Sequence, residues 1–395
     1  MLFEFDSLED QKAKIKVIGV GGAGGNAINR MISSGLSGVE FVAINTDAQD
    51  LENNNASTKI QIGKNLTKGL GAGAKSDIGR NAMEDEKDSV ANIIEDADMI
   101  FVTAGMGGGT GTGAAPIIAQ ISRELGALTV GVVTKPFNFE GPKRMNRANS
   151  GLEEMQKNCD TIIVIPNQKL INIADKNTTL VESFQMADNV LNQATRGISD
   201  LINVHGIVNL DFADVDTIMR NKGDAIMGTG VASGDERAVL AAQQAISSPL
   251  LDDINMQGAQ GVLVNITGGD NLTLMETNEA CEIIFEEAGK DANVIFGAVI
   301  DPNMGDEMNV TVIATGFNSK TISKNNDILK HENSIPTFKK DADTINDKNN
   351  IPAFAKKNVD GNNDSNELKS DLNEKRIYDS TEDDLESPAY FRMQN

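Results

Sequence analysis

The nine residues "GMGGGTGTG" (Gly105–Gly113) contain six glycines and two threonines, Thr110 and Thr112. They follow "ADMIFVTA" (Ala97–Ala104), a run apolar enough for a buried strand. Glycine adopts positive φ at little cost and lets a ligand approach the backbone closely. Backbone N–H groups at the start of a helix attract anions. The stretch therefore predicts a phosphate-binding turn between a strand and a helix.

Short β-rich runs alternate with helical patterns on both sides of this turn, from Lys14 to about Phe317. Such alternation favours an α/β fold, and near-continuous apolar runs are typical of strands buried on both faces of a parallel sheet. Five runs have this character: Ile15–Val20, Val39–Thr46, Ala97–Ala104, Leu128–Thr134 and Thr161–Asn167. We expect a Rossmann-like domain with a parallel sheet.

The pattern changes after "ESFQMADNVLNQATRGISDLINV" (Glu182–Val204), an apolar-periodic run long enough for a central helix. Beyond it, three β-rich runs and one helical pattern indicate a second, smaller α+β domain. These are Gly261–Gly268, Asn293–Ile300 and Met308–Phe317, with the helix at Leu274–Gly289. From Ser319 to Asp384 the chain is rich in Asn, Lys and Asp, and its few apolar residues cannot offset chain entropy, which predicts a disordered C-terminal tail.

These shifts predict six segments along the 395 residues. They are an N-terminal extension (1–13), a nucleotide-binding domain (14–181), the central helix (182–204), the α+β domain (205–318), a disordered linker (319–384) and a terminal peptide (385–395).

Composition excludes several classes of function. With 58 acidic and 35 basic residues the net charge is −23, which argues against nucleic acid or anionic lipid as a partner. Cys159 and Cys281 lie far apart without a nearby His, so we expect core residues rather than a disulfide or zinc site. No apolar run reaches about 18 residues and the N-terminus is acidic, so we expect a cytoplasmic protein without direct membrane insertion.

A second glycine-rich stretch, "GVGGAGGNA" (Gly19–Ala27), directly follows the first strand. Gly19, Gly21 and Gly24 have the spacing of a dinucleotide-binding turn, and Glu40 lies where a ribose-binding acid is expected. A dinucleotide-dependent oxidoreductase is therefore one hypothesis. A third glycine-rich stretch, Gly69–Ala74, favours a triphosphate instead, because a dinucleotide requires a single pyrophosphate turn.

No lysine follows these glycines in the pattern of a P-loop, so phosphate charge would be met by backbone N–H groups, helix N-termini and a metal ion. Thr110 and Thr112 are candidate N-caps. Pro116 is expected in the first turn of the helix that follows, where its missing N–H has no cost. A glycine-rich turn that only packs helix on strand is the alternative interpretation.

The segments "GGGTGTG" (Gly107–Gly113), "VGGAGGNA" (Val20–Ala27) and "NLDFADV" (Asn209–Val215) together resemble the tubulin-like GTPases, and among them the bacterial cell-division proteins. The resemblance extends from about Lys14 to Phe317. It implies a GTP-binding domain, a long central helix, a C-terminal domain, GTP hydrolysis with Mg²⁺, and head-to-tail assembly into filaments of the division ring at mid-cell. A non-hydrolysing scaffold of the same group is a further alternative.

The resemblance also implies which residues bind GTP. Those facing the phosphates would be Gly22, Ala23, Gly24, Gly25, Asn26, Gly71, Ala72, Gly73, Gly108, Gly109, Thr110 and Gly111. Asn26 would also reach the base. Glu140 and Arg144 would contact ribose and phosphate, although by spacing alone they are an ordinary helix-surface pair. Phe184 would stack on guanine and Asp188 would accept from its N1–H and amino group. By spacing alone, Phe184 reads as a core residue and Asp188 as a solvated one.

In "NLDFADVD" the resemblance assigns catalysis to Asn209, Asp211 and Asp214, which would enter the pocket of the next subunit and orient water and metal. Acidic residues in a loop are otherwise usually solvated. Three departures from the family pattern are His205-Gly206-Ile207, Lys75-Ser76 and Pro142.

The terminal peptide "ESPAYFRMQN" (Glu386–Asn395) resembles the partner-binding peptide of the family, I-P-x-F-L-R. Its contacts with membrane-tethering and regulatory division proteins would be made by Pro388, Tyr390, Phe391 and Arg392. Two upstream segments are weaker copies, "SIPTFKK" (Ser334–Lys340) and "NNIPAFAKK" (Asn349–Lys357). Ordinary drift of a linker sequence also accounts for the upstream pair.

Overall fold

A computed structural model of the chain describes residues 13–175, 177–204, 206–208, 210–251 and 256–317. His205, Asn209 and all tail segments named above lie outside these residues. Within them, no helix is both long and apolar enough to cross a membrane.

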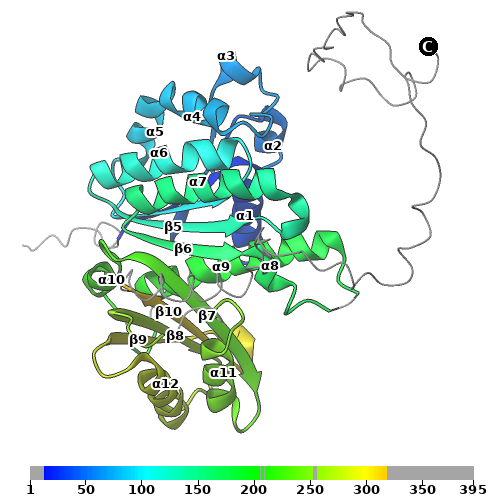
Figure 1. The fold of residues 1–395 in the computed structure, drawn as a ribbon. Coiled ribbons are helices and arrows are strands. Elements are labelled where there is room, and N and C mark those ends of the chain that lie inside the picture. The colour runs from blue at the N-terminus through cyan, green and yellow to red at the C-terminus, as the bar shows by residue number, and fades with distance from the viewer. Residues whose placement is uncertain (1–12, 176, 205, 209, 252–255, 318–395) are drawn as a thin grey trace, which may run out of the picture. The chain divides into compact units, whose positions relative to one another are not determined.

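The described strands form one sheet in the order β3-β2-β1-β4-β5-β6-β7-β10-β8-β9 (Figure 1). From β3 to β7 all neighbours are parallel. β10 is antiparallel to both β7 and β8, and β9 is parallel to β8. The strands are β1 Ile15–Val20, β2 Val39–Asn45, β3 Thr58–Gln61, β4 Met99–Gly105, β5 Leu128–Lys135, β6 Thr161–Pro166, β7 Gly223–Ser233, β8 Gly261–Gly268, β9 Asn293–Ile300 and β10 Glu307–Thr315.

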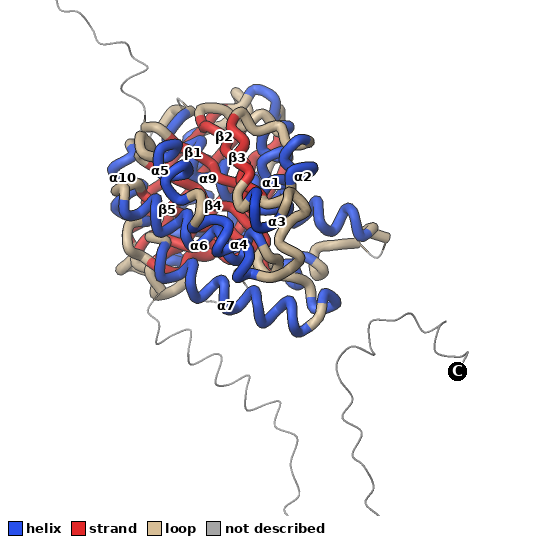
Figure 2. Tube along the Cα trace, turned by 90° about the horizontal axis from the view of Figure 1, so that it is seen from above, coloured by secondary structure: helices blue, strands red, loops and turns tan. Residues whose placement is uncertain are grey.

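Helices cover both faces of this sheet (Figures 1 and 2). They are α1 Gly21–Ser33, α2 Ala48–Glu52, α3 Lys64–Thr67, α4 Ser76–Glu84, α5 Lys87–Ile94, α6 Thr110–Glu124, α7 Pro142–Asn158, α8 Asn167–Leu170, α9 Leu180–Asn203, α10 Phe212–Met219, α11 Arg237–Ile246 and α12 Leu274–Ala288. Two short 3-10 helices, η2 Asn138–Glu140 and η3 Pro302–Met304, complete the described elements. The predicted α/β class with a parallel sheet is confirmed.

The buried strands explain why their sequences are continuously apolar. All six residues of β1 are buried, and they alternate between two cores. Ile15 and Val17 pack with α1, α9 and α10, whereas Ile18 and Val20 pack with α4, α5 and α6 on the opposite face. A third core lies between α11, α12 and the strands β7, β8 and β10. The two cysteines are free and buried, as expected.

Two strands were not predicted, β3 and β7. β7 carries Gly228 and Gly230, and glycine is uncommon inside strands. A Cβ at these positions would lie 2.0 Å from the Ala245 carbonyl oxygen and 2.1 Å from that of Ala241. The glycines are therefore required by the close packing of α11 on the strand, a tertiary contact that strand propensity does not reveal.

The central helix α9 begins two residues before the predicted start, because Thr179 caps it. The Thr179 hydroxyl accepts a hydrogen bond from Glu182 N at 3.2 Å, and Glu182 Oε2 accepts one from Thr179 N at 2.7 Å. Along its length α9 packs against both parts of the sheet. Gly197 lies against Thr311 of β10, and its carbonyl oxygen accepts from Asn265 Nδ2 of β8 at 3.1 Å.

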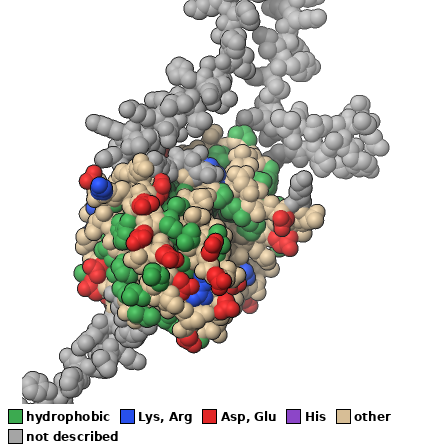
Figure 3. Space-filling view, turned by 90° about the horizontal axis from the view of Figure 1, so that it is seen from below, with side chains coloured by type: hydrophobic (Ala, Val, Ile, Leu, Met, Phe, Trp, Pro, Cys, Tyr) green, Lys and Arg blue, Asp and Glu red, His purple; other side chains and the backbone are tan. Residues whose placement is uncertain are grey.

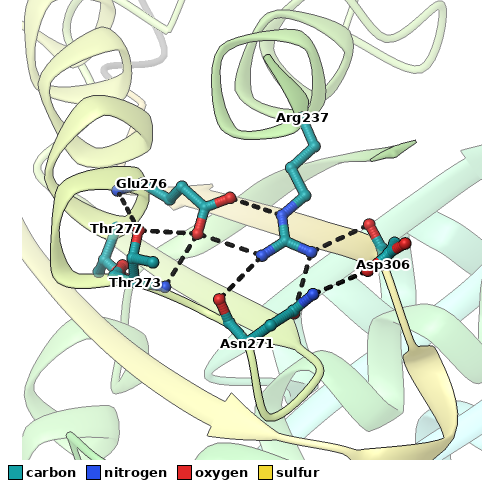
Figure 4. A network of polar contacts seen from close by, with 6 residues as sticks. All are labelled: Arg237, Asn271, Thr273, Glu276, Thr277 and Asp306. Carbon is teal, nitrogen blue, oxygen red and sulfur yellow. Dashed lines mark hydrogen bonds and ion pairs between the residues drawn. The ribbon is translucent and has the colours of Figure 1, made fainter. Parts of the chain in front are cut away.

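Arg237 at the start of α11 connects the elements between α11 and β10 through a network of polar contacts (Figure 4). Its side chain is 5% exposed and bonds Glu276 Oε1 of α12 through Nε at 2.6 Å. The remaining guanidinium nitrogens donate to Glu276 Oε2, to Asn271 and to the Asp306 carbonyl oxygen. This network ties α11 and α12 to the loops that precede α12 and β10.

The face seen from below in Figure 3 shows acidic and apolar side chains interspersed. α12 alone carries five glutamates and no basic residue. Such a surface repels polyanions, in line with the net charge.

Candidate functional site

A pocket of about 390 Å³ opens at the carboxyl ends of β1 and β4, which are neighbours although they are not consecutive in the chain. In a doubly wound sheet this is the topological switch point, where ligands bind. The pocket is lined by Val20, Gly21, Gly22, Ala23, Asn45, Asp47, Asp50, Gly71, Ala72, Ala74, Gly105, Gly108, Gly109, Thr110, Gly111 and Arg144. All three glycine-rich turns therefore meet in one pocket.

The first turn leads directly from β1 into α1, which begins at Gly21 (φ +71°) without a side-chain cap. The N–H groups of its first turn remain available to an anion. Gly22 and Ala23 line the pocket. Gly24 is buried, and a Cβ there would lie 2.5 Å from the Thr103 carbonyl oxygen. Gly24 thus allows α1 to pack against β4, and neither it nor Gly25 is among the lining residues.

The turn between β4 and α6 contributes Gly108, Gly109, Thr110 and Gly111. Neither threonine caps α6, since the N-cap is Gly109 without a side-chain bond, which corrects that expectation. Thr112 Oγ1 instead accepts from Gly107 N at 2.8 Å, and Thr110 Oγ1 is 2.6 Å from Thr46 Oγ1. The two hydroxyls therefore shape the turn.

Pro116 does not lie in the first turn of α6. The helix begins at Thr110, six residues earlier, so the proline falls in its second turn. The expectation was wrong because it placed the start of the helix by the proline. The start is set instead by the backbone at Gly109, which already has helical φ and ψ.

The middle glycine-rich turn, Gly69–Ala74, is held at the pocket by backbone contacts. Ala48 N donates to the Gly69 carbonyl oxygen at 3.0 Å. Gly71 has φ +83°, and Ala72 is buried. Gly73 is exposed and does not line the pocket.

Three polar residues at and after the end of β2 line the pocket and were missed by the sequence reasoning: Asn45, Asp47 and Asp50. Asn45 Nδ2 donates to Asp50 Oδ2 at 2.6 Å. Burial raises the pKa of Asp50, and the negative charge of Asp47 raises it further, against the bond from Asn45. They could have been found from the sequence, because the predicted parallel strands β1, β2 and β4 all end at the same edge of the sheet.

A magnesium ion is implied by the family resemblance, and this donor set fits it. Mg²⁺ usually takes one or two carboxylates and completes its shell with water and phosphate oxygens. Asp47 and Asp50 supply two carboxylates beside the phosphate turns. No group of three or more His, Cys, Asp or Glu suited to a metal occurs in the described part of the chain.

Arg144 lines the pocket, and Glu140 holds it there. Arg144 Nη1 lies 3.0 Å from Glu140 Oε2, while Glu140 Oε1 accepts from Phe137 N at 2.8 Å. Glu140 belongs to η2 and Arg144 to α7, so the two are not a pair on the surface of one helix. Glu140 itself is not a lining residue.

Asn26, Phe184 and Asp188 lie beyond the pocket lining, where α1 packs on α9. Arg30 Nε donates to Asn189 Oδ1 at 2.5 Å, and one turn further along both helices Ser34 Oγ is 3.2 Å from Asn192 Oδ1. The two helices therefore run in the same direction. Asn26 is one turn before Arg30 on α1, and Phe184 to Asp188 are about one turn before Asn189 on α9. This register places Asn26 beside that part of α9.

The side chains of this second region suit an aromatic ligand with hydrogen-bond donors. Phe184 is 40% exposed, and its ring contacts Phe137 edge-on with centroids 5.5 Å apart. The interpretation of Phe184 as a core residue is therefore not supported. Burial raises the pKa of Asp188 to about 6, against the opposing effect of the Arg30 charge. Asp188 is partly buried and not a freely solvated acid.

Asn167, at the carboxyl end of β6, is a further residue that the sequence reasoning missed. It is 5% exposed, and its Oδ1 has no hydrogen-bond partner among the described residues. Its neighbour Gln168 accepts from Asn138 N at 3.0 Å, so Asn167 lies near η2 and Phe137. A buried unpaired acceptor is costly without a ligand to satisfy it.

Asp211 and Asp214 lie at the opposite edge of the sheet from the pocket. Asp211 closely follows α9 in the chain, and α9 ends beside the start of β2, where Asn203 Nδ2 donates to the Gly38 carbonyl oxygen at 3.0 Å. The other end of α10 lies beside the first residue of β6, where Thr161 Oγ1 donates to the Met219 carbonyl oxygen. The pocket adjoins the last residues of β1 and β4, roughly 20 Å away along the parallel strands. In Figure 2, α10 accordingly appears at the left and α1, α2 and α3 at the right.

Comparison with known proteins identifies the chain's relatives. The profile of the Tubulin/FtsZ family, GTPase domain, matches residues 14–175, and that of the FtsZ family, C-terminal domain, matches residues 223–318. The structure of an empty FtsZ dimer from M. jannaschii shares 45% sequence identity, with a TM-score of 0.75 over 78% of this chain and 90% of that one.

This chain belongs to the FtsZ family of tubulin-like GTPases. An FtsZ point mutant from M. jannaschii is similar at 46% identity and a TM-score of 0.75, covering 78% of this chain and 93% of that one. CetZ2 from Haloferax volcanii, solved as a GTPγS-bound protofilament, has a TM-score of 0.65 at 21% identity over 81% of this chain and 99% of that one, which shows a shared fold.

FtsZ-family membership argues against the dinucleotide-dependent oxidoreductase, and so does the geometry. Glu40, the expected ribose acid, is the second residue of β2 and pairs with Lys16 at 3.2 Å. Lys16 is the second residue of β1, so both lie at the edge of the sheet away from the pocket. Glu40 is therefore in the wrong place to bind a ribose.

Proposed function

We propose that this FtsZ-family protein binds and hydrolyses GTP, and that copies assemble head to tail so that α10 of one copy completes the pocket of the next. One observation carries the proposal. The phosphate turns and the acids Asp211 and Asp214 lie at opposite edges of the same sheet, so they cannot meet within one chain but can meet between successive copies. This arrangement makes hydrolysis depend on assembly.

The phosphates would be held mainly by backbone N–H groups. The first turns of α1 and α6 both point into the pocket with uncapped N–H groups, and together with Gly71 and Ala72 they surround its space. Arg144 adds one positive charge. We assign Gly22, Ala23, Gly24, Gly25, Gly73, Gly108, Gly109, Thr110 and Gly111 to the same cradle, of which Gly24, Gly25 and Gly73 contribute by shaping the turns.

Guanine specificity would come from the region between α1 and α9. Asp188 as a carboxylate accepts from the N1–H and amino group of guanine, which adenine cannot satisfy. The free Oδ1 of Asn167 is a second acceptor, Asn26 adds an amide, and Phe184 offers a ring face for stacking. Glu140 would reach the ribose.

Hydrolysis transfers the γ-phosphoryl group to water. The water oxygen forms a bond to the γ-phosphorus while the bond to the bridging oxygen of the β-phosphate breaks, releasing GDP and phosphate. A Mg²⁺ ion held near Asp47 and Asp50 would neutralise charge on the phosphates. Asn209, Asp211 and Asp214 of the preceding copy would orient the water, and one of the two carboxylates would accept its proton.

Self-assembly is supported by exposed apolar side chains around both sites. Leu70 (83%), Phe139 (62%) and Val181 (66%) flank the pocket and the base region, while Ile207 (69%) precedes the α10 loop. Exposed residues of this size are typical of interaction surfaces. The solved FtsZ from M. jannaschii is a dimer, which also supports association of this chain with itself.

We further propose that the protein is cytoplasmic, gathers at the mid-cell division site, and contacts membrane-tethering division proteins through Pro388, Tyr390, Phe391 and Arg392. Many weak peptides on one filament would give firm attachment. Deleting residues 318–395 should preserve GTP-dependent polymerisation and abolish filament recruitment to partner-coated lipid. Replacing Phe338 and Phe354 by Ala tests the upstream copies, since unchanged recruitment would mark them as linker.

GTP turnover per subunit, measured against protein concentration, tests the central proposal. We expect no turnover at low concentration and a constant rate per subunit above a threshold that coincides with the onset of sedimentable polymer. A rate per subunit that does not vary with concentration would refute the shared site. Polymer without phosphate release would instead favour the non-hydrolysing scaffold.

A further inference from the structure

α10 carries the proposed catalytic acids at its first residues, so its orientation decides where they point. Its buried side chains, Val215, Ile218 and Met219, anchor it in the core beside α9. Its last turn is fixed by polar contacts at the amino-terminal edge of β5 and β6. Gly223 N donates to the Asp160 carbonyl oxygen at 2.9 Å, just after the helix ends.

Arg123, in the last turn of α6, bridges this junction. Its Nη2 donates to Asn221 Oδ1, two residues after α10. Its Nη1 donates to the Lys157 carbonyl oxygen at 3.2 Å, and its Nε lies 3.6 Å from Asp160 Oδ1. Asp160 is 2% exposed and also accepts from Thr129 N at 2.9 Å, so it is a rigid anchor for the guanidinium.

The other end of α6 forms a wall of the phosphate pocket, at Gly109, Thr110 and Gly111. α6 has 15 residues and is therefore about 22 Å long. Like α9, it reaches from the chain's own binding region toward α10, and its far end contacts the residues that follow α10. Asn221 has φ +58°, a conformation that Asn adopts more readily than most other residues with side chains.

We propose that Arg123 is a positioning residue for GTP hydrolysis: by binding Asn221 it fixes α10 to the end of α6, and so aims Asp211 and Asp214 at the pocket of the next copy. Arg123 touches neither the chain's own pocket nor the acids themselves. The inference rests on the proposed trans site. It assigns a role in hydrolysis to the contact between Arg123 and Asn221, neither of which is among the proposed GTP-binding or catalytic residues.

The contact can be removed from either side in the full-length protein. Arg123→Ala removes the donor. Asn221→Gly removes the acceptor and keeps the backbone conformation, because glycine adopts positive φ freely. Each change should lower the turnover rate of assembled protein at saturating GTP about tenfold, since small misplacements of catalytic groups have effects of that order or larger. GTP affinity should stay as in the wild type in both variants, and so should the melting temperature of the GDP-bound Asn221→Gly monomer. Arg123→Ala also leaves the buried Asp160 carboxylate without its cation, so its melting temperature should be lower.

Arg80→Ala is the matched control, because Arg80 is 41% exposed, against 40% for Arg123, and binds Glu154 without any link to α10. It should leave turnover unchanged. The double variant of Arg123 and Asn221 should be no slower than either single variant. Fully additive losses, unchanged turnover, a loss of GTP affinity that accounts for the lower turnover, or a lower melting temperature of Asn221→Gly would each overturn the proposal.

A different set of results would show that the pocket is not completed by α10 of the neighbouring copy. In that case the wild-type rate per subunit would not depend on concentration, and Asp214 variants would remain active. A concentration-dependent wild type with fully active Arg123→Ala and Asn221→Gly would refute only the role of Arg123.

Discussion

Asp211 and Asp214 cap α10 reciprocally: Asp211 Oδ1 accepts a hydrogen bond from Asp214 N at 2.9 Å, and Asp214 Oδ2 lies 3.4 Å from Asp211 N. The two acids thus stabilise the start of the helix as well as carrying the proposed chemistry. Replacing either by alanine removes both roles at once. A variant that keeps the cap is needed to separate them.

Asp214→Asn keeps an oxygen at the cap and removes the charge. We expect GTP binding and polymer formation to persist while turnover falls roughly 100-fold, as when one charge-stabilising group is lost from an active site. The turnover rate is measured as phosphate release from sedimented polymer. Asp224→Asn, a change of the same kind on β7, should be nearly neutral. Wild-type turnover by the Asp214 variant would remove this residue from catalysis.

Asp188→Ala should reduce discrimination between GTP and ATP. It leaves the N1–H and amino donors of guanine unpaired, which lowers the preference by about 1–3 kcal/mol. Competition binding of the two nucleotides is the measurement. Phe184→Leu is a useful comparison, because loss of stacking should weaken both nucleotides alike. Unchanged discrimination in the alanine variant would exclude Asp188 from the base site.

The same residue predicts a pH dependence of nucleotide binding. Burial raises the pKa of Asp188 to about 6, and only the carboxylate form accepts both guanine donors. GTP affinity should therefore be full above pH 7 and decline as the pH falls through 6. The decline should be absent in Asp188→Ala. A titration of GTP affinity between pH 5 and 8 that is equally steep in both proteins would assign the effect to another group.

Asp200 of α9 should make the fold less stable as pH rises. Burial raises its pKa to about 6, against the favourable charge of Arg196, and Asp301 raises it further. The folded state then holds a proton that the unfolded state releases, so stability declines between about pH 4 and 6. Asp200→Asn should raise the free energy of unfolding at pH 7.5 by on the order of 2 kcal/mol. Equal stability of the variant and the wild type in urea at pH 7.5 would contradict this.

The Arg237 network should contribute strongly to the last part of the fold. Arg237→Met leaves Glu276 without its cation in a largely buried site, at a cost of about 3 kcal/mol in the free energy of unfolding. The bond from Arg237 lowers the pKa of Glu276 to about 2, so its stabilisation is present above pH 4.5 and is lost as pH falls toward 2.

Urea unfolding at pH 7 and at pH 3 measures both effects. Arg237→Met should lose most of the difference between the two pH values that the wild type shows. Glu276→Gln, which keeps a hydrogen-bonding side chain and the cap on α12, should be less destabilised than Arg237→Met. A methionine variant as stable as the wild type would show that the network is replaceable.

Local patterns in the sequence were sufficient for much of this fold and site. β1 and β8 have the predicted bounds, because strands buried on both faces must be continuously apolar. β9 also has its predicted bounds, although it is an edge strand and only partly buried. The three glycine-rich turns were recognisable for a similar reason: close packing of backbone on backbone and positive φ exclude side chains there. β7 was missed because its glycines are required by close packing against α11, and this contact is not visible in the sequence of the strand itself.

Only the tertiary structure showed which residues meet. Asn45, Asp47 and Asp50 reach the pocket because β2 lies beside β1, and the unpaired Oδ1 of Asn167 is evident only once its surroundings are known. The placement of Asp211 and Asp214 at the far edge, and the contact of Arg123 with Asn221 across 98 positions, depend on how strands pair and helices pack. Sequence patterns report what each residue's immediate backbone requires, whereas such long-range contacts are decided by the packing of the whole sheet.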